Sequence, residues 1–289
     1  MFDSLTRSWR FATTSYGILW HNKTLLVLPV IATLAAAAVA ASFLAPLYFT
    51  GAFAEWGSLA QKGEALSIAQ KVTIGVLVFL FYYCMFFVII FFNSALVAGA
   101  LKAIAGEPIG VTEMLTIAGS RLPQIAGWAA VSAIVGVVLK SIENSNEKAG
   151  MFVSSLLGTG WTVMTFFVVP TIVVDGLGPF GALKKSLEVL KQQWGQALVG
   201  NMSIGLLGFL LLLPVYLLAF GLGAAAVYST SWTVAVPCIV GAALLAVLAI
   251  SVSCAAEMVF RALLFNFATG QTLPSDIVAE ELKLAFKAK

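Results

Sequence analysis

Six apolar runs alternate with short polar connectors along the chain, and this pattern dominates the sequence. Each run is about as long as, or longer than, the roughly 20 residues that cross a bilayer core of about 30 Å as a helix. The runs lack the shorter, alternating segments of a membrane β-barrel. We therefore expect an all-α membrane protein in one domain, residues 1–289, whose six transmembrane helices form three hairpins. The expected spans are 25–48, 72–100, 124–142, 151–174, 196–227 and 233–267.

Four shorter segments have apolar residues on one face only, and they separate and flank the three hairpins. In the clearest of them, apolar residues recur at spacings of three and four and charged residues take the opposite side. Its apolar stripe consists of Phe180, Leu183, Leu187, Leu190 and Trp194. Such helices lie in the membrane surface rather than crossing it. We expect four of these interfacial helices, at about 2–20, 111–122, 179–194 and 275–287.

The ends of the second, fourth and sixth spans follow the same order of residue types. Each passes from aromatic residues through a small or apolar tail to glycine and then proline, and an amphipathic segment follows. These ends are residues 91–108, 166–179 and 259–274. The recurrence predicts an internal structural repeat. The alternative is that membrane helices commonly end in aromatic residues, glycine and proline without being related.

The charged residues lie mostly on one side of the predicted membrane. Only 10% of the residues are charged and 61% are hydrophobic, against about 25% charged in an average soluble domain. Of the 16 lysines and arginines, the other side receives only Lys62, Lys71, Lys140 and Lys148. By the positive-inside rule, both termini and all four amphipathic helices are expected in the cytoplasm. The formal net charge of +3 is too small to suggest a nucleic-acid partner.

Basic residues beside two of the amphipathic helices are candidates for contact with anionic lipid headgroups, at about 1 kcal/mol each. They are Arg7, Arg10, Lys184, Lys185 and Lys191. The alternative is that these basic residues only determine the membrane topology, which would explain their positions without any specific lipid contact. Both interpretations make membrane lipids on the cytoplasmic side the expected partners.

The residues that most enzymes need are scarce in this chain. The one histidine, His21, excludes a zinc centre of the HExxH or three-histidine type and is expected at the membrane surface. The three cysteines lie in apolar runs without CxxC spacing, and neither G-x-S-x-G nor G-x-x-x-x-G-K-[ST] occurs. Asp175 precedes a glycine-rich turn without a second carboxylate to face it, so it is interpreted as a turn residue. We expect no enzyme activity, no cofactor and no metal.

Polar side chains inside the predicted spans are costly to bury in lipid and therefore form the candidate functional site. Ser253, Glu257 and Arg261 are spaced four apart near the end of the sixth span and share one helix face. When the three span ends are aligned, Asn93 falls at the place of Arg261, so both are expected to point into a centre formed by spans two, four and six. Asn201 in the fifth span completes the candidate set. The alternatives are that Glu257 and Arg261 only lock helix packing, and that the asparagines only join helices by hydrogen bonds.

Four segments form distinctive blocks of sequence: FFNSALV (91–97), WAAVSAIVG (128–136), WTVMTFFVVP (161–170) and DGLGPFGALKKS (175–186). These blocks resemble those of a bacterial integral-membrane family that is known only as a domain of unknown function. The resemblance spans essentially the whole chain and implies a multi-pass protein of the bacterial inner membrane. It implies no substrate, cofactor or catalytic residue.

Two classes of function are compatible with these features. A transport- or pore-type protein is favoured by the repeat, by spans interrupted with proline and glycine, and by Glu257. The alternative is a non-transporting accessory, assembly or lipid-handling scaffold of a membrane complex, favoured by four amphipathic helices on one leaflet. A protein partner or a second copy of the chain fits either class. A continuous polar cavity that reaches Glu257 is the feature that separates them.

Overall fold

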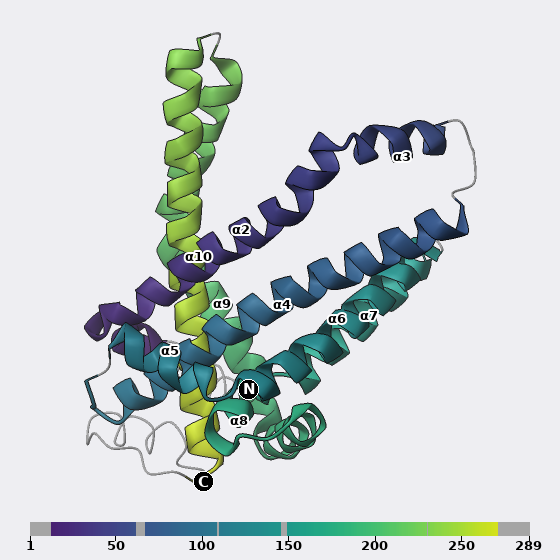
Figure 1. Ribbon diagram of the computed structural model, residues 1–289. Coiled ribbons are helices and arrows are strands. Elements are labelled where there is room, and N and C mark those ends of the chain that lie inside the picture. The colour runs from purple at the N-terminus through teal and green to yellow at the C-terminus, as the bar shows by residue number, and fades with distance from the viewer. Residues whose placement is uncertain (1–12, 62–66, 109, 146–148, 230, 271–289) are drawn as a thin grey trace.

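The computed structural model describes residues 13–61, 67–108, 110–145, 149–229 and 231–270, and every regular element in them is helical. Residues 13–21 form a helix, and a short 3-10 helix, η1 (Lys23–Leu26), leads from it into the first long helix. The α-helices that follow (Figure 1) are α2 (Val27–Phe49), α3 (Ala52–Gln61), α4 (Ile68–Ile104), α5 (Val111–Gly119), α6 (Leu122–Ser145), α7 (Ala149–Met164), α8 (Val168–Asp175), α9 (Pro179–Tyr228) and α10 (Trp232–Ala268).

Within the residues that the structure describes, six helical stretches are long and apolar enough to cross a membrane. The prediction of an all-α protein with six helices of membrane-spanning length is therefore confirmed. The six stretches are Lys23–Phe49, Ile68–Ile104, Leu122–Glu143, Val153–Asp175, Gly208–Tyr228 and Trp232–Ala268.

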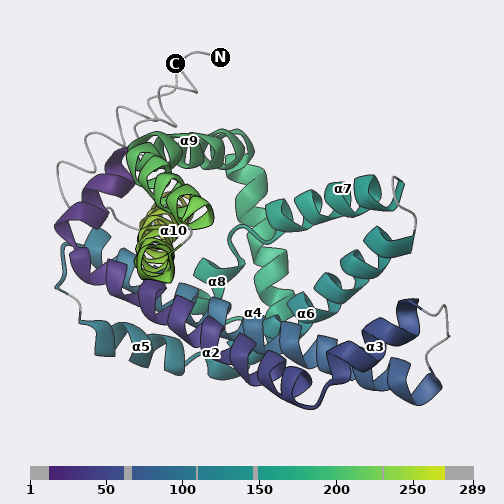
Figure 2. The ribbon, with the colours of Figure 1, turned by 90° about the horizontal axis from the view of Figure 1, so that it is seen from above.

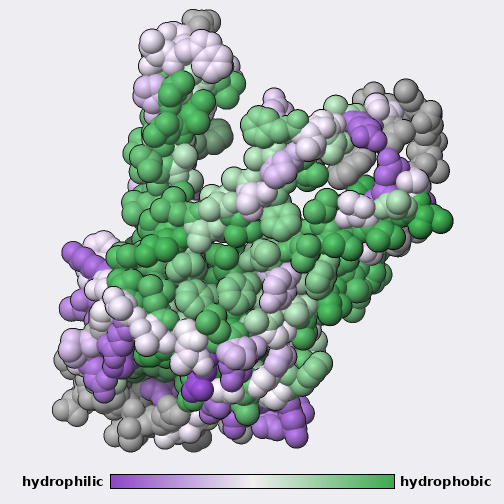
Figure 3. Space-filling model, viewed as in Figure 1, coloured by the Kyte–Doolittle hydropathy of each residue, from purple (hydrophilic) through white to green (hydrophobic). Residues whose placement is uncertain are grey.

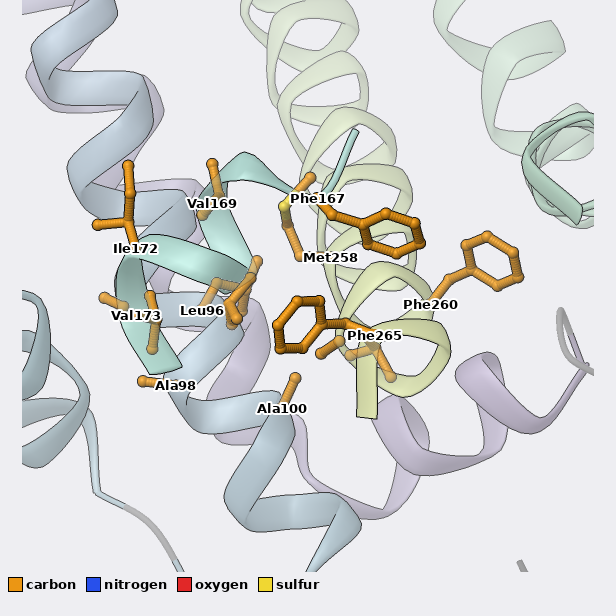
Figure 4. Close-up of a cluster of buried hydrophobic side chains, with 14 of the residues drawn as sticks. Leu96, Ala98, Ala100, Phe167, Val169, Ile172, Val173, Met258, Phe260 and Phe265 are labelled. Carbon is orange, nitrogen blue, oxygen red and sulfur yellow. The ribbon is translucent and has the colours of Figure 1, made fainter. Parts of the chain in front are cut away.

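The ends of α4, α8 and α10 meet in one buried core (Figure 4). Leu96, Phe167 and Phe265 come from the three segments, and each leaves no more than 1% of its surface exposed. The rings of Phe167 and Phe265 lie 6.0 Å apart. These are the three span ends that follow the same order of residue types, so the segments that are alike in sequence pack together. The buried stretches are 94–100, 166–173 and most of 255–266.

Beyond this core the helices separate into two arms (Figures 1 and 2). The later part of α9 pairs with α10 in one arm, and α2, α3, α4, α6 and α7 form the other. In Ile68–Ile104, only 6% of the residues in a continuous apolar segment of 18 residues are buried, and in Trp232–Ala268 the corresponding share is 11%. The space-filling view shows an open notch between the arms, with apolar surface on both sides (Figure 3). Most of the apolar surface of the arms therefore faces outward instead of packing against other helices.

The fourth span, expected as one helix over 151–174, is interrupted in the structure. α7 ends at Met164 and α8 begins four residues later. Pro170 explains the break, because it has no N–H and its ring displaces the carbonyl four residues before it. The freed backbone groups bond to Ser186 of α9, whose hydroxyl accepts from the Phe167 N–H (3.1 Å) and donates to the Met164 carbonyl (2.8 Å). Such internal partners are what make a broken helix tolerable at membrane depth.

The turn after α8 is held by the start of α6. α8 ends at Gly176, whose φ is 64°, and a Cβ there would lie 2.6 Å from a guanidinium nitrogen of Arg121. Arg121 Nε donates to the Val173 carbonyl (3.3 Å), and Gln124 Nε2 donates to the Gly176 carbonyl (3.3 Å). These bonds satisfy carbonyls that the end of a helix leaves free. The glycine-rich turn predicted at Asp175 is therefore also a contact between two helices.

The expected surface helix 179–194 and the expected fifth span 196–227 form one continuous helix, α9. The glycine between them does not end the helix, because an internal glycine costs only about 1 kcal/mol. The first part of α9 nevertheless runs in a different direction from the part beside α10 (Figures 1 and 2). It buries Ala182, Val189 and Leu190, and Leu183 packs against the core, so Leu183 and Leu190 of the expected apolar stripe take part in packing. Phe180, also expected on that stripe, is 79% exposed, so the face that packs overlaps the predicted one only in part.

Other expected bounds also change. α4 begins four residues before the expected span because Ser67 and Gln70 form a capping box: the Gln70 N–H donates to Ser67 Oγ (3.2 Å) and the Ser67 N–H donates to Gln70 Oε1 (2.9 Å). The amphipathic segment expected at 111–122 is divided between α5 and the start of α6. Residues 2–12 of the first expected surface helix, and all of the last one at 275–287, lie outside the described residues.

Candidate functional site

A polar cavity of about 230 Å³ lies where α10, the later part of α9 and the helix of residues 13–21 meet. Ser253 and Glu257 reach it from one face of α10, because residues four apart lie above one another on a helix. Tyr16 and Tyr216 reach it from the other two helices. All of these polar side chains can accept hydrogen bonds, and one of them is a carboxylate. The remaining lining residues are Gly205, Gly208 and Phe209.

Glu257 forms an ion pair with Arg261 one turn further along α10. Arg261 Nη2 donates to Glu257 Oε1, and the two side chains are 16% and 37% exposed, respectively. The Arg261 guanidinium also lies over the Phe166 ring, 4.7 Å from its centroid, in a cation–π contact. Arg261 is therefore held on two sides, and it fixes the position of the Glu257 carboxylate beside the cavity.

Tyr16 brings the helix of residues 13–21 close to the backbone of α9. Its hydroxyl oxygen would clash with a Cβ on residue 208, so the glycine at this position permits the close approach. Burial of the ring, with a smaller contribution from Tyr216, raises the pKa of Tyr16 to about 12. Tyr16 is therefore a neutral hydroxyl at physiological pH, able to donate and to accept hydrogen bonds.

A second cavity of about 230 Å³ lies at the bottom of the notch, where α2, α4 and α10 meet. Most of its lining is apolar, and its few polar groups include Asn93 and Thr33. Cys254 Sγ donates to Asn93 Oδ1 across 3.7 Å and joins α10 to α4. The lining residues are Pro29, Ala32, Thr33, Ala36, Ile89, Phe92, Asn93, Leu96, Ile250 and Cys254. A third cavity, of about 410 Å³, surrounds Ser229, Ser231 and Trp232 at the far end of α9 and α10.

The structure distributes the predicted site residues over two cavities instead of one shared centre. Ser253 and Glu257 line the polar cavity, Asn93 lines the cavity of the notch, and Arg261 lies against Phe166. These three cavities have no described lining residue in common. The side chain of Asn201 lies outside the part of the chain that the structure describes, although its backbone belongs to α9.

The two tyrosines of the polar cavity were not among the predicted site residues. Tyr16 was expected on the apolar face of a surface helix, and no motif distinguishes Tyr216 from the other aromatic residues of its span. Their meeting with Glu257 depends on the packing of three helices that are distant in sequence.

Among the described residues, no three or more His, Cys, Asp or Glu side chains lie close enough together to hold a metal ion. His21 Nδ1 lies 2.8 Å from the Gly17 carbonyl and the residue is exposed. Cys84, Cys238 and Cys254 are free thiols.

The predicted headgroup-contact residues that the structure describes lie on the first part of α9. Lys184 and Lys191 are exposed there, and Lys185 is partly buried. Arg7 and Arg10 lie outside the described residues. Hydrophilic residues gather mainly around this lower end of the molecule, while green apolar surface covers the arms (Figure 3).

An all-helical chain with six apolar helices of spanning length is a multi-pass membrane protein, and its length and composition assign it to that class. The chain belongs to the family of unknown function DUF6159, whose family model matches residues 72–273. The resemblance to an uncharacterised family is thereby confirmed. The match runs from α4 through α10 and includes the site residues on those helices. No curated protein matches the chain.

Proposed function

We propose that this protein belongs to the second of the two classes, as a lipid-handling scaffold of the bacterial inner membrane. The observation that carries the proposal is the notch, because two arms that diverge from one core cannot enclose a water-filled path between them. A channel or carrier needs polar groups around an enclosed route. The described cavities are separate, and the one at the bottom of the notch is mostly apolar.

The notch has the chemistry that an acyl chain requires. Its walls belong to helices long and apolar enough to cross a bilayer, so lipid rather than water borders them. The mostly apolar lining of the cavity between α2, α4 and α10 favours an apolar ligand. We propose that one acyl chain of a membrane phospholipid enters between α2, α4 and α10, with its end near Asn93 and Cys254.

The membrane topology is part of the same proposal. We propose three helical hairpins related by an internal repeat, with both termini and the core in or near the cytoplasmic leaflet. The basic residues Lys184, Lys185 and Lys191 then lie beside anionic headgroups, each adding about 1 kcal/mol to lipid binding. The same is proposed for Arg7 and Arg10. The protein partner of such a scaffold is either another membrane protein or a second copy of this chain.

Photo-crosslinking from the acyl chain tests the proposal. The purified protein is reconstituted into phosphatidylethanolamine and phosphatidylglycerol vesicles that contain a phospholipid with a diazirine at the end of one chain. We expect adducts to concentrate on the residues that line the notch cavity. Ala36→Phe fills that cavity and is expected to reduce the adducts about tenfold, which corresponds to roughly 1.4 kcal/mol.

Ala37→Phe is the matched control, because Ala37 is the next residue of α2, is exposed, and is not part of the cavity lining. Its adducts are expected to match those of the native protein. Adducts spread evenly over α2, α4 and α10, and unaffected by Ala36→Phe, would contradict the proposal.

Transport is the second candidate, and the polar cavity at Glu257 favours it. Flux of monovalent cations and of small amines into vesicles that contain the native protein or Glu257→Gln separates the two classes. The lipid-handling proposal expects no flux above that of empty vesicles. Flux that requires Glu257 would instead establish the transport class.

A further inference from the structure

We propose that the polar cavity beside Glu257 binds an organic ammonium group. The cavity lies between α10, α9 and the helix of residues 13–21, whereas the notch lies between α10, α2 and α4. It is therefore a second site with its own chemistry on a neighbouring side of α10, and its occupancy does not depend on an acyl chain in the notch.

The lining of this cavity consists of hydrogen-bond acceptors around one carboxylate. Arg261 occupies Oε1 of Glu257, while the other carboxylate oxygen makes no hydrogen bond within the described residues. The hydroxyls of Tyr16, Tyr216 and Ser253 supply three further oxygens. Among the described residues that line it there is neither lysine nor arginine. The cavity therefore suits a ligand that is positively charged and donates several hydrogen bonds.

Aromatic rings select an organic cation over a metal ion. Tyr16, Phe209 and Tyr216 all line the cavity, and the last two rings stack with their centroids 6.1 Å apart. Ring faces attract ammonium groups, and the attraction grows as the group is desolvated. Calcium takes six to eight oxygen ligands and usually several carboxylates, and one carboxylate with three hydroxyls does not supply them.

The size and position of the cavity fit the amine of a small ligand or of a lipid headgroup. Its volume of about 230 Å³ exceeds that of an ethanolammonium group. Tyr16 lies before the first spanning stretch, which begins at Lys23, and Glu257 lies in the last third of the sixth, Trp232–Ala268. The cavity is therefore near the end of the membrane spans, where headgroup amines are found. A phosphatidylethanolamine headgroup and a free primary amine offer the same ammonium chemistry.

Two binding measurements on the full chain test the site. In detergent, calorimetric titration with ethanolammonium chloride is compared with sodium chloride at the same ionic strength. In nanodiscs, native mass spectrometry compares retention of phosphatidylethanolamine with that of phosphatidylglycerol. We expect ethanolammonium or phosphatidylethanolamine to bind saturably, and sodium and phosphatidylglycerol not to do so. Glu257→Gln is expected to weaken binding at least about tenfold, since it removes the charge that strengthens the hydrogen bond to an ammonium group.

A second variant avoids disturbing the ion pair. Ser253→Leu fills the cavity while leaving Glu257 and Arg261 in place, and it is expected to abolish binding. Ser155→Leu is the matched control, because Ser155 lies exposed on α7 and lines none of the three cavities. It is expected to bind like the native protein.

The outcomes distinguish three cases: the site binds a soluble amine, it binds a lipid headgroup, or it binds no ammonium group. Binding of ethanolammonium alone assigns a soluble amine, and selection of phosphatidylethanolamine alone assigns a lipid headgroup; both support the site if Ser253→Leu abolishes them. Equal binding of sodium, or equal binding by the Ser253→Leu and Ser155→Leu variants, overturns it, as does binding of neither probe. Ala36→Phe is expected to leave ammonium binding unchanged, so failure of the notch proposal is distinguishable from failure of this one.

Discussion

The core and the arms of this protein are built from similarly apolar helices, yet they are packed differently. α4 contains both situations in one helix: its first half is bulky and largely exposed, whereas residues 94–100 are buried. The buried stretch, SALVAGA, is rich in small residues, while the exposed half is rich in phenylalanine, valine and leucine. Small residues let helix backbones approach closely. Side-chain size, and not hydropathy, therefore separates the contacts between helices from the surface left for lipid.

Gly99 shows how close that approach is. A Cβ there would lie 2.7 Å from Leu25 Cδ2 and would also meet Met114 Sδ, so α4 contacts both η1 and α5 at this point. Gly75, in the exposed half of the same helix, has nothing within 4 Å of its would-be Cβ. Gly99 is therefore tightly packed against other helices, whereas Gly75 in the same helix has open space beside it.

The largest effect is expected from enlarging the glycine in the core. Gly99→Leu overpacks the contact with Leu25 and Met114 and is expected to lower the free energy of unfolding by about 3 kcal/mol or to prevent folding. Gly75→Leu adds the same side chain to the exposed half and is expected to leave stability unchanged or slightly raised. Thermal unfolding in one detergent, followed by circular dichroism, compares them. Equal losses would show that the two halves of α4 do not differ as described.

The break between α7 and α8 provides the next test. Ser186→Ala leaves the Phe167 N–H and the Met164 carbonyl without their partner and is expected to cost about 2 kcal/mol. Ser155→Ala removes a hydroxyl from the exposed surface of α7 and is expected to cost less than about 0.5 kcal/mol. The same unfolding measurement applies. If both variants unfold like the native protein, the broken helix does not depend on Ser186.

A smaller effect is expected at the turn after α8. Gly176→Ala must adopt a positive φ and displace the Arg121 side chain, and we expect it to cost about 1–2 kcal/mol. Gly178→Ala, two residues later, meets nothing within 4 Å and has a φ of −68°, so it serves as the control. A cost at Gly178 as large as that at Gly176 would remove the role given to Arg121.

The smallest effect concerns Tyr16 and alkaline pH. The native pKa of about 12 lies above the ordinary value of 10.0, so packing of the neutral phenol favours the folded state below pH 10. That contribution is lost as the pH rises from about 10 to about 12. The difference in phenolate absorbance between native protein and Tyr16→Phe is expected to reveal one phenol that ionises near pH 12. Ionisation near pH 10 would mean that Tyr16 does not reach the buried position.

Local signals in the sequence predicted the spans well and their interruptions poorly. Runs of apolar residues identify six spans because the length that a bilayer requires is a local property. The break at Pro170 depends on whether another helix supplies bonds to the backbone, whereas the continuity of α9 across Gly195 depends on the small cost of an internal glycine. Ser186 does so for the first of these, and its position in sequence does not indicate this role.

The candidate site was predicted only in part, because local spacing can be read from the sequence and contacts between distant helices cannot. The spacing of Ser253, Glu257 and Arg261 on one helix indicated a shared face, and the ion pair follows from that spacing. Asn93 and Glu257 line different cavities because different helices pack against the two sides of α10. Alignment of the span ends had placed Asn93 and Arg261 in one centre, because sequence order does not specify the rotation of packed helices.

The lengths of the apolar runs and the placement of charged residues are enough to assign the class of this protein and to locate its spans. The meeting of Tyr16 and Tyr216 with Glu257 around one cavity, and the separation of the arms at the notch, depend on how the helices pack. Hydropathy and helical periodicity act over one turn or one span and do not specify that packing. Cavities arise where side chains from distant helices meet, and those meetings depend on the size of each residue in the contact.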